Sequence, residues 1–122
     1  MKFVKEYIED EIGKPLPTNF EEIYRTKTKE RFAKELQPIE GIHELIANLT
    51  IPFCVASNAP FGKMNFNLKK VGLYPFFENK MFSAYKVNAW KPDPKLFLTA
   101  AETMGFHPSK CLVVEDLSLI HI

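Results

Sequence analysis

Three short polar segments contain the residue types that could carry out chemistry in this chain. Each follows an apolar stretch typical of a buried strand, and ligands bind at the carboxyl ends of the strands in parallel α/β sheets. The three segments are Ser57-Asn58, Lys91-Pro92-Asp93-Pro94 and Glu115-Asp116. A hydroxyl, an ammonium and a carboxylate pair at one sheet edge suit a phosphate group and a divalent cation. We therefore expect the three segments to converge on one pocket.

Ser57 stands just before a predicted helix. Its hydroxyl and the backbone N–H groups that follow it could hold phosphate oxygens, because the N-terminus of a helix attracts anions. The alternative is a serine that merely turns the chain. A nucleophilic serine is disfavoured, because the sequence has no Gly-x-Ser-x-Gly segment.

The residues of the Lys-Pro-Asp-Pro segment favour a turn that leads into a helix. Pro92 favours an extended conformation at Lys91, Asp93 is placed to cap the next helix, and Pro94 suits the first position of that helix. Lys91 is then left in a loop, directed toward the strand ends. The alternative for this lysine is an ordinary solvated surface position.

Glu115 and Asp116 form an adjacent carboxylate pair. Such a pair repels itself unless a cation is bound, and Mg²⁺ prefers hard oxygen ligands of this type. The alternative is a helix cap or an exposed turn.

Bulk composition is that of an ordinary globular protein. The chain has 122 residues, 46% hydrophobic and 25% charged, which amounts to one domain or less. The net charge of +1 gives no reason to expect nucleic acid or an anionic membrane as a partner, and the apolar runs are too short to span a bilayer. Cys54 and Cys111 are predicted to lie reduced inside buried strands, which favours a cytoplasmic location.

The pattern of residues changes near residue 37. Residues 1–36 predict two helices, the first ended by Gly13 and the second capped by Thr18 or Asn19. We expect the apolar side chains of the second helix to be buried, namely Phe20, Ile23, Tyr24, Phe32 and Leu36.

From residue 37 onward, helices and strands alternate. The predicted helices are 41–49, 62–71 and 94–104, and the predicted strands are 52–56, 81–84 and 111–114. This alternation indicates an α/β fold with a parallel sheet flanked by helices. Residues 117–122 break the turn expected after Asp116 and are predicted to be a non-native tail.

The order of these segments resembles the haloacid dehalogenase-like (HAD) hydrolases with a helical cap. Within that family the chain is most similar to sugar-phosphate phosphatases of the 6-phosphogluconate phosphatase type. The segments that carry the resemblance are residues 57–60, 68–73 and 90–94. The resemblance implies that residues 1–36 are part of the cap and that residues 37–116 are part of a Rossmann-like core.

The resemblance also implies a role for each candidate residue. Ser57, helped by Asn58, would bind the phosphoryl group through hydrogen bonds. Lys91 would offset negative charge on the phosphate and on the acyl-phosphate. Glu115 and Asp116 would be ligands of Mg²⁺, the expected cofactor.

The reaction implied is hydrolysis of a small phosphorylated metabolite, a phosphate monoester such as a sugar phosphate, through an aspartyl-phosphate. The family's nucleophile and its acid/base partner lie in an Asp-x-Asp motif before the cap, and Asp10 does not fit that role because its surroundings are helical and charged. We therefore expect this chain to be inactive alone. The alternatives are a β-phosphoglucomutase-like phosphotransferase and a non-catalytic module that binds a phosphorylated ligand.

Overall fold

The computed structural model describes residues 2–116, apart from the side chain of Lys2. The predicted tail at residues 117–122 lies outside the described residues. The chain divides into two compact units, Met1–Leu36 and Gln37–Ile122. The identity of the first unit as part of a cap stays a prediction.

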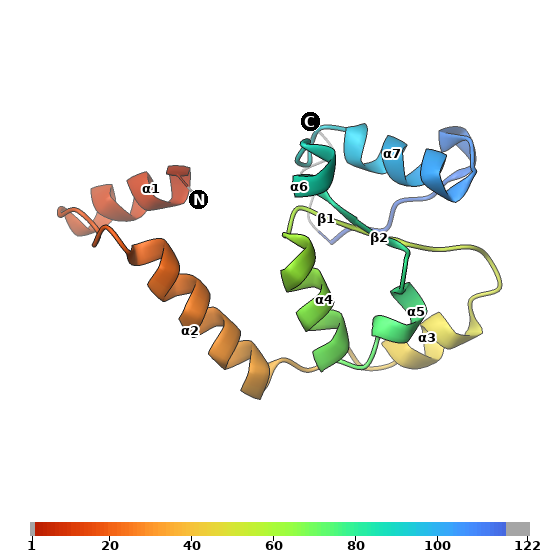
Figure 1. The fold of residues 1–122 in the computed structure, drawn as a ribbon, viewed down its shortest axis with the longest axis horizontal. Helices are drawn as coiled ribbons and strands as arrows, with labels where there is room; N and C mark the ends of the chain where they lie inside the picture. The colour runs from red at the N-terminus through yellow and green to blue at the C-terminus, as the bar shows by residue number, and fades with distance from the viewer. Residues whose placement is uncertain (1, 117–122) are drawn as a thin grey trace. The chain divides into compact units, whose positions relative to one another are not determined.

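The first unit consists of two helices, α1 (Lys2–Ile12) and α2 (Phe20–Glu35) (Figure 1). Gly13 ends α1 as predicted. It adopts a φ of +66°, and its N–H donates to the carbonyl of Glu9 at 3.0 Å, a left-handed ending that glycine adopts without steric cost. Asn19 precedes α2, but its side chain makes no capping hydrogen bond among the described residues.

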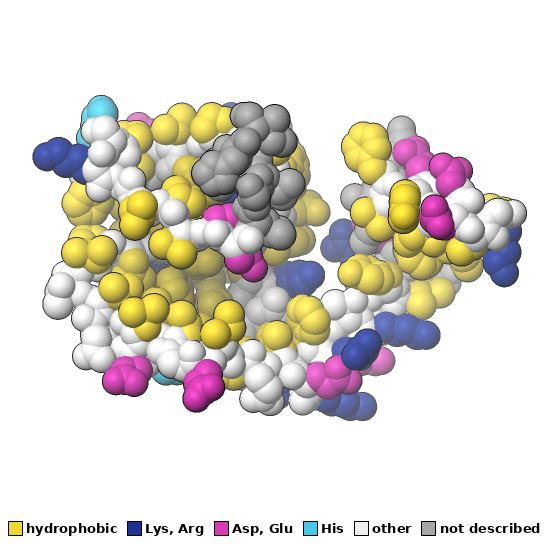
Figure 2. Space-filling model, turned by 180° about the vertical axis from the view of Figure 1, so that it is seen from behind, with side chains coloured by type: hydrophobic (Ala, Val, Ile, Leu, Met, Phe, Trp, Pro, Cys, Tyr) yellow, Lys and Arg dark blue, Asp and Glu magenta, His cyan; other side chains and the backbone are white. Residues whose placement is uncertain are grey.

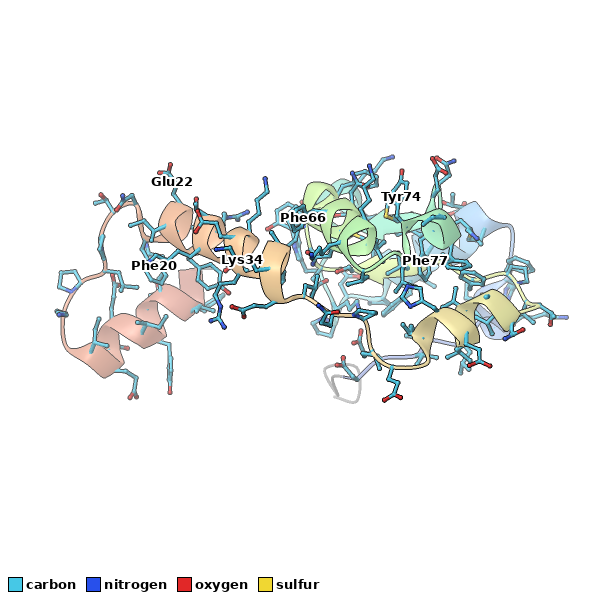
Figure 3. All side chains as sticks on the ribbon, turned by 90° about the horizontal axis from the view of Figure 1, so that it is seen from below. Phe20, Glu22, Lys34, Phe66, Tyr74 and Phe77 are labelled. Carbon is cyan, nitrogen blue, oxygen red and sulfur yellow. The ribbon has the colours of Figure 1, made fainter. Side chains whose placement is uncertain are left out.

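The predicted burial along α2 is wrong. None of the described residues of α2 is buried, and Phe20 and Tyr24 stack on each other with ring centroids 6.3 Å apart. Figure 3 shows Phe20, Glu22 and Lys34 projecting from this helix. The physical reason is size, because two short helices have too little surface to enclose a core of their own.

The second unit alternates helices with two short strands. Its elements are α3 (Ile42–Asn48), β1 (Val55–Ser57), α4 (Phe61–Lys70), α5 (Tyr74–Phe77), β2 (Met81–Ser83), α6 (Ala84–Val87), α7 (Lys95–Met104) and the 3₁₀ turn η1 (Pro108–Lys110). The predicted helices near α3, α4 and α7 are confirmed. The short helices α5 and α6 were not expected from the sequence.

The two strands pair in parallel, as the α/β pattern predicted. The register sets Val55 beside Met81 and Ser57 beside Ser83. Helices α4 and α7 lie on opposite sides of the strands (Figure 1), which is the layering of an α/β fold. Ser57 and Ser83 end their strands side by side. The turns that follow the two strands therefore lie at the same edge of the sheet.

The described core of the second unit comes from helices on both sides of the strands, with Met64 of α4 and Phe77 of α5 buried as well as residues of α6 and α7. Leu96 of α7 and Ala84 of α6 are 0% exposed, and Ala100 and Ala101 are also buried. Phe77, labelled in Figure 3, meets Phe53 edge to face with ring centroids 5.4 Å apart. The apolar positions of α7 thus anchor the helix that begins just after the Lys-Pro-Asp-Pro segment.

The predicted buried strand at residues 111–114 is wrong. These residues are irregular, and Leu112 and Val114 are each 89% exposed. No described residue forms a strand ladder with this segment, and β1 is paired along one edge, with β2. A strand is stable only when a neighbour takes up its N–H and C=O groups, so the apolar pattern alone does not create one.

Exposed apolar side chains are common on the second unit. Figure 2 shows hydrophobic side chains on the face of the molecule turned toward the viewer. The large exposed apolar side chains of the second unit include Ile39, Leu45 and Ile51 in addition to Leu112 and Val114. Within residues 2–116, no helix combines the length and apolar character needed to cross a bilayer.

The predicted burial of Cys111 is also wrong. Both cysteines are free thiols, but Cys111 is exposed, whereas Cys54 is half-buried directly before β1. Burial raises the pKa of the Cys54 thiol above its ordinary value, and the nearby Cys111 adds to that rise.

Replacing Leu96 with alanine should destabilise the second unit. The side chain is fully buried, so its loss removes apolar contacts and leaves a cavity, at a cost of about 2–5 kcal/mol in the free energy of unfolding. Urea denaturation followed by circular dichroism measures this change. Leu98→Ala on the same helix is the matched control, because Leu98 is 47% exposed and its loss should change the free energy by about 0.5 kcal/mol. Equal effects of the two variants would contradict the assigned core.

The two thiols should differ in reactivity. At pH 8 we expect iodoacetamide to alkylate Cys111 about tenfold faster than Cys54, because the attacking species is the exposed thiolate and the raised pKa of Cys54 lowers its thiolate fraction. Peptide mass spectrometry at timed intervals measures both rates in one sample. The Cys111→Ser variant should retain the slow reaction alone, and equal rates at the two cysteines would refute the difference in burial.

Candidate active site

Ser57 ends β1 and begins the turn into α4. The N–H of Ala59 donates to the Ser57 hydroxyl oxygen at 3.1 Å, and Pro60 precedes the first turn of the helix. The hydroxyl hydrogen of Ser57 is not used in this bond. The turn therefore leaves Ser57 able to donate to an anion at the N-terminal end of α4.

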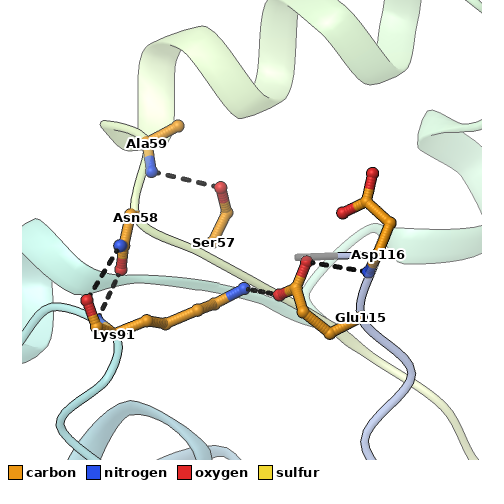
Figure 4. Close-up of polar contacts among 6 residues, drawn as sticks. All are labelled: Ser57, Asn58, Ala59, Lys91, Glu115 and Asp116. Atoms are coloured by element: carbon orange, nitrogen blue, oxygen red, sulfur yellow. Dashed lines mark hydrogen bonds and ion pairs between the residues drawn. The ribbon is translucent and has the colours of Figure 1, made fainter. Parts of the chain in front are cut away.

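Asn58 joins this turn to the Lys-Pro-Asp-Pro segment. Its Oδ1 accepts from the backbone N–H of Lys91 at 2.8 Å, and its Nδ2 donates to the carbonyl oxygen of Lys91 at 3.4 Å (Figure 4). The two residues are 33 positions apart in the sequence. The Asn58 carboxamide thus both accepts a hydrogen bond from the main chain of Lys91 and donates one to it.

Lys91 is not a solvated surface lysine. Its side chain is 14% exposed, and its ammonium forms an ion pair with Glu115 at 2.5 Å and lies 5.3 Å from the ring centre of Phe97. The hydrogen bond from Lys91 lowers the pKa of Glu115 below its ordinary value, and the N–H of Asp116, which donates to Glu115 Oε1 at 3.2 Å, acts in the same direction. Lys91 and Glu115 are therefore held as a charged pair.

Asp116 lies beside this pair and is exposed (Figure 4). It forms no ion pair with any described residue, and residues 2–116 contain no cluster of three or more metal-ligating side chains. The donor chemistry still suits Mg²⁺, which is commonly bound by one or two carboxylates together with water and phosphate oxygens. The role of Glu115 and Asp116 as oxygen ligands of Mg²⁺ stays a prediction.

Asp93 has the structural role that the sequence predicted. Its Oδ1 accepts from the N–H of Lys95 at 2.8 Å, at the first residue of α7. The Lys91–Pro92 peptide bond is cis, and the N–H of Asp93 donates to the carbonyl of Trp90 at 2.9 Å. The segment is therefore a tight turn that leads directly into a core helix.

The structure thus brings all of the predicted site residues together. Ser57 and Asn58 are adjacent, Asn58 bonds Lys91, Lys91 pairs with Glu115, and Asp116 follows Glu115 (Figure 4). The catalytic, phosphate-binding and metal-binding roles assigned to them stay predictions.

A family model described as haloacid dehalogenase-like hydrolase matches residues 1–117. This chain belongs to the haloacid dehalogenase-like hydrolases. The 6-phosphogluconate phosphatase of Escherichia coli (strain K12) is 38% identical over 99 residues, which cover 81% of this chain and 45% of that protein. The protein YhcW of Bacillus subtilis (strain 168) is 34% identical over 117 residues, which cover 91% of this chain and 51% of that protein.

The fold of a solved member of the same family agrees with this assignment. A haloacid dehalogenase-like protein of unknown function from Agrobacterium tumefaciens str. C58 superposes with a TM-score of 0.75 and 29% identity, covering 86% of this chain and 48% of that protein. The chain thus spans about half the length of each of these three relatives.

Ser83 is a residue of this HAD-like site that the sequence analysis missed. It is 2% exposed, and its hydroxyl donates to the carbonyl of Ala59 at 2.7 Å and accepts from the N–H of Tyr85 at 3.3 Å. Ser83 ends β2, the strand beside β1, and its hydroxyl therefore stabilises the turn that follows Ser57. The same hydroxyl caps α6. The available signal was a serine at a strand end directly before helix-forming residues, which is an N-cap pattern.

Replacing Ser83 with alanine should loosen the turn after Ser57. The change leaves the carbonyl of Ala59 and the N–H of Tyr85 without this partner in a partly buried place, so we expect a loss of about 1–3 kcal/mol in the free energy of unfolding. Urea denaturation measures the loss. The control is Ser109→Ala, which removes an exposed hydroxyl that contacts His107 and should cost about 0.5 kcal/mol. A neutral Ser83→Ala variant would show that the hydroxyl does not hold the turn.

Proposed function

We propose that this chain is the phosphate-binding part of a Mg²⁺-dependent phosphatase that hydrolyses a small phosphate monoester, with a sugar phosphate as the substrate class. The observation that carries the proposal is the bonded series from Asn58 through Lys91 to Glu115, which lies beside Ser57 at the end of β1. Membership of the HAD-like hydrolases supports it, as does similarity to a protein named 6-phosphogluconate phosphatase.

Lys91 supplies positive charge in the proposed reaction. Phosphoryl transfer spreads negative charge over the phosphate oxygens, and a fixed cation stabilises that charge. A lysine ammonium has three N–H donors. One bonds Glu115 in this structure, which leaves two that can be directed at phosphate oxygens. Glu115 thereby aims the ammonium.

Ser57 orients the phosphate in this proposal. Its oxygen already accepts from the N–H of Ala59, so its hydrogen is available to a phosphate oxygen. Glu115 and Asp116 would hold Mg²⁺, which when bound neutralises charge on the phosphate. The nucleophile is an aspartate carboxylate from a part of the protein outside this sequence, and its attack would divide hydrolysis into formation and breakdown of an aspartyl-phosphate.

Replacing Lys91 with alanine should lower turnover much more than substrate binding. In the protein encoded by the complete reading frame, we expect kcat for p-nitrophenyl phosphate with Mg²⁺ to fall about 10²–10³-fold, with a much smaller change in KM, because the charge matters most in the transition state. Steady-state kinetics and assay of released inorganic phosphate measure both parameters.

Lys95→Ala is the matched control for this experiment. Lys95 is exposed and lies four residues further along the chain, so its loss should leave kcat unchanged. An unchanged kcat in Lys91→Ala would overturn the role given to the lysine. Movement of the phosphoryl group between substrate hydroxyls without release of phosphate would identify a phosphotransferase instead. Binding of phosphate with no turnover in the wild type would identify a non-catalytic module.

A further inference from the structure

We propose that Asn58 is a positioning residue that acts through the main chain of Lys91, rather than a ligand of the phosphate. The inference rests on the proposed function, because it gives Lys91 its catalytic purpose. The two hydrogen bonds between the Asn58 carboxamide and Lys91 carry it. Each polar atom of the carboxamide has one partner on the Lys91 main chain, so Asn58 is held by the protein before any phosphate binds.

The main chain of Lys91 lies outside regular secondary structure. It follows α6 and precedes α7, and neither helix includes it. Pro92 has no N–H that could join a ladder. Backbone N–H and C=O groups in partly buried places require partners, and the Asn58 side chain provides one for each group of Lys91. The carboxamide therefore takes the place that a neighbouring strand would occupy.

The pair of hydrogen bonds restricts the position of Lys91 more tightly than a single hydrogen bond would. The carboxamide is planar, so an accepted bond at Oδ1 and a donated bond at Nδ2 together set both the distance and the angle of Lys91 relative to the turn after β1. The Lys91 side chain then extends from a fixed Cα to Glu115. A small rotation of this Cα would be amplified along the four-carbon side chain, so the position of the ammonium depends on Asn58.

The chemistry of the site requires a carboxamide at this position. An aspartate could still accept from the N–H of Lys91, but it could not donate to the carbonyl of Lys91. It would also add a negative charge to the site. An alanine would remove both bonds. These three side chains therefore form a graded series with two, one and no bonds to Lys91.

The test uses the 122-residue chain and measures where Lys91 is held, without requiring activity. A limiting amount of acetic anhydride acylates lysine amines, and peptide mass spectrometry gives the acylation rate of Lys91 relative to that of exposed Lys95 in the same molecule. We expect Asn58→Ala to raise this ratio about fivefold or more, because the ammonium is no longer held against Glu115. Asn58→Asp should give an intermediate ratio, since it retains the 2.8 Å bond.

Asn48→Ala is the matched control. The Asn48 carboxamide also donates to a main-chain carbonyl, that of Glu44 at 2.9 Å, but on the exposed helix α3, so its loss should leave the ratio at the wild-type value. A merely structural effect of Asn58→Ala would raise the rate of half-buried Lys80, whose ammonium lies over the Phe53 ring, together with that of Lys91. That result, or a ratio unchanged from wild type, would overturn the proposal. If Asn58→Ala does not fold, the result for Asn58→Asp decides the question. The proposal then requires its Lys91-to-Lys95 acylation ratio to exceed that of the wild type.

A parallel sample separates this proposal from the proposed function. Inorganic phosphate with Mg²⁺ should slow acylation of Lys91 in the wild-type chain if Lys91 faces the phosphate site. Absence of this protection, together with a raised ratio in Asn58→Ala, would count against the phosphate site and still support positioning by Asn58. Protection in the wild type with no change of the ratio in Asn58→Ala would support the phosphate site and refute positioning.

Discussion

The hydrogen-bonded contact between Asn58 and Lys91 is the constraint on which the arrangement of this site depends. It joins the turn after β1 to the turn before α7, two loops that no strand ladder connects among the described residues. Lys91 then reaches Glu115, which lies in an irregular segment. The site is thus a series of side-chain contacts next to a two-stranded sheet. The contact of Lys91 with Glu115 depends on the contact of Asn58 with Lys91.

Local features of this chain could be predicted from its sequence. Asp93 caps α7 because Asp before Pro and an apolar helix is a local signal, and Gly13 and Gly105 end their helices with positive φ. The parallel pairing of β1 with β2 followed from strands that alternate with helices. In the candidate site, the order of Ser57, Lys91 and Glu115 past apolar stretches was enough to expect them together.

Features that depend on distant neighbours could not be predicted in the same way. The stretch before Glu115 has a strand-like composition, but an apolar pattern does not supply the partner strand that would pair with it. The apolar residues of α2 are not buried for a related reason, since burial needs a second surface. Two contacts of the site involve main-chain atoms, which have no sequence pattern of their own. They are the pair of hydrogen bonds from Asn58 to the Lys91 backbone and the hydrogen bond from Ser83 to Ala59.

The sequence separations within the site bear on when it forms during folding. Asn58 and Lys91 are 33 residues apart, and Lys91 and Glu115 are 24 apart, so each contact closes a long loop and incurs the associated entropy. Helices such as α4 and α7 form from local contacts and need no such closure, and long-range contacts of this kind slow folding. The charged groups of the site therefore meet late, after local helices such as α4 and α7 have formed. Until that moment a newly made chain carries an unpaired lysine and carboxylates that keep it solvated.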